Sequence, residues 1–155
     1  LQTVRPCGEA VRLSPEDAAK AQYEWHKRRL GESELKARAE GLKPGSVREF
    51  DPECGERLSC RAGSASFWVT WDGKMSPCGM MTEPSVPLDD FGEAWREIMR
   101  CSREIFLPPK CSGCDKRMLC DVCAAVTKAE SGEFNGLPDY ACRKAAEYRR
   151  LLLGE

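Results

Sequence analysis

The segment CSGCDKRMLCDVC, residues 111–123, holds four of the ten cysteines in this 155-residue chain. Its spacing is Cys111-x2-Cys114-x5-Cys120-x2-Cys123. Thiolates two or five residues apart can converge on one inorganic centre, because a short turn points their sulfurs to the same side. A single CxxC pair is a weak signal. Two pairs in one run, among further cysteines, predict a metal or metal-cluster site.

Four more cysteines flank this run and belong to the same pattern. They are Cys54, Cys60, Cys78 and Cys142. Eight thiols can be divided into two groups of four in roughly 35 ways, so the spacing alone does not choose a partition. It also leaves three kinds of site open, namely iron–sulfur clusters, structural zinc and a disulfide framework.

The distribution of cysteine argues against the disulfide framework. Residues 8–53 contain no cysteine and have the composition of ordinary helix. Disulfide scaffolds are usually shorter and more evenly crosslinked. We therefore expect a cytoplasmic protein. Cys7 and Cys101 have no partner close in the sequence, and both are expected to be ordinary thiols rather than metal ligands.

Charge and hydropathy argue against two further classes of protein. The formal net charge is -1, without the basic excess that a nucleic-acid partner favours. No apolar segment approaches the ~18 residues that a membrane-spanning helix needs. The length suits one domain, or one compact domain with an appendage.

The local signals predict an α+β fold, made of a small β-hairpin, helices and loops. Ser14 and Pro15 are typical of a helix start and predict a helix over 15–30, followed by a shorter one that ends near residue 40. Ala18, Ala21 and Trp25 are expected on the apolar face of the first helix.

The second half of the fold is predicted by turn and cap residues. Asp72-Gly73 lies between two apolar runs and predicts a hairpin over 66–78. Its tryptophans, Trp68 and Trp71, are expected in the core or on the hairpin face. Helices are predicted over 90–103, capped by Asp89 or Asp90 with Phe91 and Ile98 facing inward, and over 139–153.

Taken together, these motifs resemble a known module, the SPASM domain, which is the C-terminal extension of many radical S-adenosylmethionine enzymes. The matching pieces are Cys60-x12-Gly73-x4-Cys78, the run over 111–123 and Cys142. The short sequence Cys60-Arg-Ala-Gly63 is also typical of the family. The chain departs from the family pattern in having two residues rather than three between Cys120 and Cys123. The resemblance covers roughly residues 50–145.

The resemblance implies two auxiliary [4Fe–4S] clusters, each bound by four cysteines. The first would be held by Cys54, Cys60, Cys78 and Cys123. The second would be held by Cys111, Cys114, Cys120 and Cys142. An α+β domain organised around these two sites, over 46–155, would serve electron transfer and substrate positioning in an enzyme of the peptide- or protein-modifying maturase type. The alternative is a structural zinc-binding interaction module.

The first part of the chain is also similar to part of that family. Residues 1–45 resemble the tail of the catalytic partial barrel, a strand end followed by helices. The CxxxCxxC motif of the catalytic cluster does not occur in the 155 residues. We therefore expect this chain alone to lack radical chemistry and to be a C-terminal fragment. An N-terminal barrel that binds S-adenosylmethionine and a peptide or protein substrate are the expected partners.

Overall fold

The computed structural model describes residues 12–40, 55–58 and 60–155 of the chain. The strand end expected near residues 1–7 and the boundary expected at 45–46 lie outside these residues. The α+β prediction is confirmed, with helices and a small antiparallel sheet. In chain order the elements are α1 (Pro15–Leu30), α2 (Glu32–Glu40), β1 (Trp68–Val69), β2 (Lys74–Ser76), β3 (Val86–Pro87), α3 (Phe91–Arg103), α4 (Pro109–Ser112), the 3₁₀ turn η2 (Arg117–Leu119), α5 (Ala124–Ser131) and α6 (Asp139–Leu153).

The helix boundaries follow from local capping. The side chain of Ser14 accepts a hydrogen bond from the backbone N–H of Asp17 at 3.0 Å, which satisfies one donor of the first turn of α1. Asp90 does the same for α3 through the N–H of Glu93 at 2.8 Å. Of the two aspartates considered at this position, Asp90 is therefore the cap.

The hairpin forms where Asp72-Gly73 predicts it. Strands β1 and β2 pair antiparallel, with Val69 opposite Met75, and Gly73 adopts a φ of +74° in the turn. A third strand, β3, pairs with β2 on its other side and was not expected from the sequence. It is only two residues long and ends in Pro87, which is too short for an alternation of apolar and polar residues to predict a strand.

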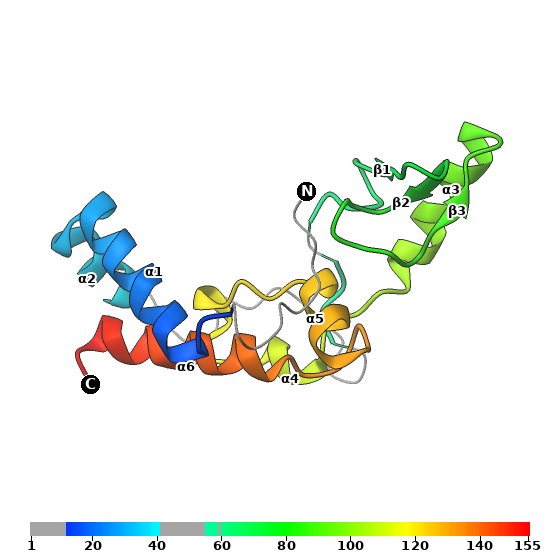
Figure 1. The fold of residues 1–155 in the computed structure, drawn as a ribbon. Coiled ribbons are helices and arrows are strands. Elements are labelled where there is room, and N and C mark those ends of the chain that lie inside the picture. Colours follow the sequence, from blue (N-terminus) through cyan, green and yellow to red (C-terminus); the bar gives the residue numbers. More distant parts are fainter. Residues whose placement is uncertain (1–11, 41–54, 59) are drawn as a thin grey trace.

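Two small apolar clusters lie in the core, one at the sheet and α3 and one around α5. In the first, Ala94 and Ile98 of α3 pack against Met75 of β2. The second joins Met81, Ile105, Leu107, Ala124 and Ala125 from the loops around α5. The sheet and α3 lie at one end of the molecule, and α1 with α2 lie at the other, beside α6 (Figure 1).

The expected positions of two aromatic side chains are wrong. Phe91 was placed on the inner face of its helix but is 54% exposed, because it is the first helical residue and extends past the sheet. Its ring lies edge-on to Phe67 at 5.4 Å. Trp71, expected in the core or on the hairpin face, is 99% exposed, because it sits in the turn beyond the last residue pair of β1 and β2.

Helix α1 packs on α6 through a face that differs from the predicted one. Ala19 is fully buried, whereas Trp25 is half exposed. His26, one residue later, lies on the inner face, seven positions from Ala19. Its Nδ1 is 2.6 Å from the hydroxyl of the buried Tyr148 in α6. The single histidine therefore joins two elements far apart in the sequence.

This contact predicts a pH dependence of stability. Burial, and secondarily Arg38, lower the pKa of His26 below 6.5, so the folded state disfavours its protonation. The unfolded chain then binds more protons, and the free energy of unfolding falls as the pH drops below 6.5. We expect the melting temperature to be lower at pH 5.5 than at pH 7.5, and this difference to shrink in His26→Gln. An unchanged difference in the variant would contradict the assignment.

Candidate metal centre

Four of the eight predicted ligands line one pocket. They come from α4, from the segment that follows it, and from α6, and they are Cys111, Cys114, Cys120 and Cys142. The space between the lining atoms is about 330 Å³, open mouth included. The structure thus brings together the set that the resemblance assigned to the second cluster.

A run of tight turns explains how three of these thiols reach the same side. The N–H of Cys114 bonds the carbonyl of Cys111, Arg117 bonds Cys114, and Cys120 bonds Arg117, at 3.3, 3.0 and 3.4 Å. Turns that close over three residues place every third side chain in line. Cys111, Cys114 and Cys120 are therefore presented together, and α6 supplies Cys142 from the opposite wall.

Burial and mutual proximity favour the neutral form of three of these thiols, Cys111, Cys120 and Cys142. Burial first, and then the neighbouring Cys142 and Cys120, raise the pKa of Cys111 to about 11. Burial also raises the pKa of Cys120 and of Cys142, and in both a second cysteine of the group adds to the rise. A bound cation would reverse this preference, because metals bind the thiolate form.

Two cations in the pocket wall are already paired with carboxylates. Lys116 contacts Asp115 at 2.6 Å, and Arg117 contacts Glu56 at 3.0 Å. The second pair also joins Glu56, two residues after Cys54, to the run of turns between Cys111 and Cys120. Within the described residues, no three His, Cys, Asp or Glu side chains converge closely enough to hold a single metal ion.

The other predicted set is described only in part. Cys54 and Cys7 lie outside the described residues. Cys78 and Cys123 pack against the same apolar cluster around Ile105 and Leu107. Cys60 is exposed and lines a different pocket. Convergence of this set therefore stays a prediction.

The pocket at Cys60, called the Cys60 pocket, is formed by residues from the segments 57–58 and 60–64 and from the end of α3. Its lining residues are Arg57, Leu58, Cys60, Ala62, Gly63, Ser64, Met99, Ser102 and Arg103. Leu58 also packs on the apolar cluster that contacts Cys78 and Cys123, so the pocket borders that part of the core.

Gly63 fixes the loop that carries Cys60. Its φ is +64°, and a Cβ there would collide with the side chain of Ser102 and lie 3.4 Å from Pro77. The carbonyl of Arg61 accepts backbone hydrogen bonds from Ser64, Ala65 and Ser66 at 3.0–3.1 Å, which closes the turn. The loop is therefore seated against α3 and beside the residue that precedes Cys78.

Two buried hydroxyls support the fit of an inorganic centre to these places. Ser102 and Ser112 carry the two buried side-chain polar atoms that have no hydrogen-bond partner in the described part of the chain. Ser102 lines the Cys60 pocket, and Ser112 directly follows Cys111. Buried hydroxyls without partners are rare, and each usually marks a strained, catalytic or ligand-facing position.

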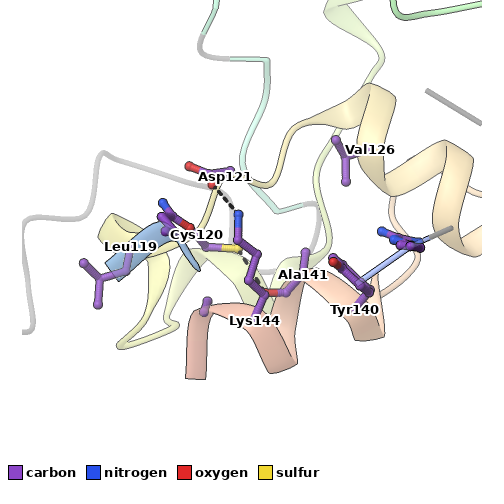
Figure 2. A pocket seen from close by; sticks show the side chains of 10 residues that line it. Leu119, Cys120, Asp121, Val126, Tyr140, Ala141 and Lys144 are labelled. Atoms are coloured by element: carbon purple, nitrogen blue, oxygen red, sulfur yellow. Dashed lines mark hydrogen bonds and ion pairs between the residues drawn. The ribbon is translucent and has the colours of Figure 1, made fainter. Parts of the chain in front are cut away.

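A further pocket adjoins the four-cysteine site, with Cys120 in both walls. Figure 2 shows Lys144 reaching towards Asp121, an ion pair of 3.1 Å, while Tyr140 lies on the same side of α6. The guanidinium of Arg12 stacks on the Tyr140 ring at 3.4 Å. These residues were not singled out from the sequence, because their spacing follows no motif and the pocket depends on how α1, α5 and α6 meet.

Comparisons with protein-family models, with curated proteins and with solved structures found no match. Among the described helices, none is both long and apolar enough to cross a membrane.

The geometry predicts which thiols can be crosslinked in the metal-free, reduced protein. A short bis-alkylating reagent such as dibromobimane should join the 109–120 segment to α6 through Cys142, because these thiols face one pocket. Peptide mass spectrometry would identify the bridge. Cys142→Ser should abolish it, whereas Cys101→Ser should not. A dominant bridge from Cys142 to Cys101 would contradict the arrangement.

Gly63 gives a second prediction. Gly63→Ala should destabilise the chain by about 2–4 kcal/mol, because it adds a collision with Ser102 to the strain of a positive φ. Gly132→Ala is the matched control, since Gly132 has a φ of +83° and open space around it. It should cost only about 1–2 kcal/mol. If denaturant titrations give the same loss in the free energy of unfolding for both variants, the loop at Gly63 does not press on α3.

Proposed function

We propose that this chain is an auxiliary [4Fe–4S] cluster-binding module of a radical S-adenosylmethionine enzyme that modifies peptides or proteins. The observation that carries the proposal is the pocket that Cys111, Cys114, Cys120 and Cys142 line together. All the residues that line this pocket belong to 46–155, so the pocket supports cluster binding without residues from the barrel-like part of the resemblance.

The family resemblance, rather than the pocket, favours a multi-iron centre over one zinc ion. A zinc site needs four sulfurs at ~2.3 Å from a single point, whereas each thiolate of a cubic cluster binds a different iron. The described thiols line one pocket together, which is compatible with either centre. The chemistry that such a cluster supplies is one-electron transfer.

The chain's own residues have three tasks at this site. The turn run aligns the thiols of Cys111, Cys114 and Cys120, and α6 closes the pocket with Cys142. Val122, Pro138 and Ala145 give the pocket an apolar wall. Such a wall limits the access of water, which tunes the potential of a bound cluster.

The second cluster is proposed at Cys54, Cys60, Cys78 and Cys123. The shared packing of Cys78 and Cys123, and the Ser102 hydroxyl in the Cys60 pocket, support this assignment. With four protein ligands in each set, neither cluster would leave an iron open to substrate. Electron transfer and support of the substrate site are therefore the roles we propose, with the barrel and a peptide substrate as partners.

The test is anaerobic reconstitution of the chain with iron and sulfide. We expect about eight iron and eight sulfide per chain, broad visible absorbance and an unchanged secondary structure. Cys142→Ser should lose about half of both, whereas Cys101→Ser should lose none. One zinc per four cysteines, with no sulfide and full folding in air, would overturn the proposal in favour of a zinc-binding interaction module.

A further inference from the structure

The wall of the four-cysteine pocket carries positive charge and no carboxylate. Besides its thiols and apolar residues, the pocket is lined by Lys116 and Arg117. Their carboxylate partners, Asp115 and Glu56, are not among its lining residues. Both ion pairs therefore present their positive ends to the pocket. In the adjoining pocket, in contrast, both members of an ion pair line the wall (Figure 2).

The backbone places Arg117 in the same row as three of the thiols. The run of tight turns aligns every third side chain, and this spacing puts residue 117 between Cys114 and Cys120. The N–H of Arg117 bonds the carbonyl of Cys114 at 3.0 Å, and its own carbonyl accepts a hydrogen bond from the N–H of Cys120 at 3.4 Å. A cation is therefore built into the row of thiols by the backbone itself.

Glu56 holds the guanidinium of Arg117 beside the pocket. The Nε of Arg117 donates to the carboxylate at 3.0 Å, and the two side chains are only 23% and 16% exposed. The backbone of Glu56 is fixed in turn, because its carbonyl accepts a hydrogen bond from the N–H of the buried Leu107 at 2.7 Å. A guanidinium has more N–H donors than one carboxylate accepts, so Arg117 can still face an anionic centre.

The two cations already act on the thiols of the metal-free chain. Burial raises the pKa of Cys111 and of Cys120, and Arg117 opposes the rise at both. Burial also raises the pKa of Cys142, where Lys116 opposes the rise. The positive side chains therefore favour the thiolate form, which is the form that metals bind.

Resting on the proposed function, we propose that Arg117, with Lys116 as the weaker partner, stabilises the reduced state of the centre in the four-cysteine pocket. Four thiolates outweigh the positive charge of an iron–sulfur core, so the bound centre is anionic and becomes more so on reduction. A cation in the wall therefore stabilises the reduced state more than the oxidised state. Arg117 contributes more than Lys116, because the Lys116–Asp115 pair is more exposed and water screens its charges.

The test is a redox titration with dithionite of the anaerobically reconstituted 155-residue chain, followed by electron paramagnetic resonance. Cys142→Ser identifies the midpoint of this pocket, because it removes one of the four thiols. Arg117→Gln should shift the reduction equilibrium of that centre about tenfold towards the oxidised state, which lowers the midpoint by ~59 mV for one electron. Arg117→Lys, which keeps the charge, should restore most of the loss.

Arg143→Gln is the matched control. It removes the same charge next to a proposed ligand in the sequence, but Arg143 pairs with Glu16, its side chain is 54% exposed, and it does not line the pocket. It should leave the midpoint unchanged. Lys116→Gln should lower the midpoint in the same direction as Arg117→Gln, by less, and it tests the inference if Arg117→Gln fails to fold.

The outcomes separate the two proposals. A midpoint that does not respond to Arg117→Gln and Lys116→Gln, or that responds equally to Arg143→Gln, would overturn the inference and leave the proposed function standing. The same holds if Arg117→Lys loses as much as Arg117→Gln, since the ion pair would then be only structural. A wild-type chain that takes up no iron and sulfide would overturn the proposed function, and the inference with it.

Discussion

The turn run from Cys111 to Cys120 is the constraint on which the centre of the molecule depends. Each of its three backbone hydrogen bonds closes over three residues, so the thiols are aligned by the backbone before any long-range contact forms. Helix α6 then completes the pocket with Cys142, and the same helix packs on α1. One helix thereby connects the four-cysteine pocket to the α1–α2 end of the chain.

This arrangement places thiols where a domain of this size would otherwise place apolar core. The two apolar clusters are small, with five and three buried residues. Protonated, buried thiols behave as small hydrophobic groups, so the pocket can persist without metal. A centre bound there would add crosslinks between segments far apart in the sequence, and its binding free energy would contribute to folding.

Features set by local hydrogen bonds could be predicted from the sequence. Ser14 and Asp90 cap their helices, Asp72-Gly73 turns the hairpin, and the spacing of residues 111–120 brings three thiols together. Features set by tertiary packing could not. The inner face of α1 carries His26 rather than Trp25, because Tyr148 of α6 supplies its partner. Strand β3 exists only through its pairing with β2.

The position of Ser102 could be predicted from the sequence, but its surroundings could not. Its place on the stripe of Ala94 and Ile98 follows from a spacing of four, which the sequence displays. The spacing does not explain why a polar residue occupies this position. Its surroundings depend on Gly63 and Cys60, which approach α3 from another part of the chain. A residue that breaks an apolar pattern without forming a hydrogen bond contributes little to stability, which favours a functional origin.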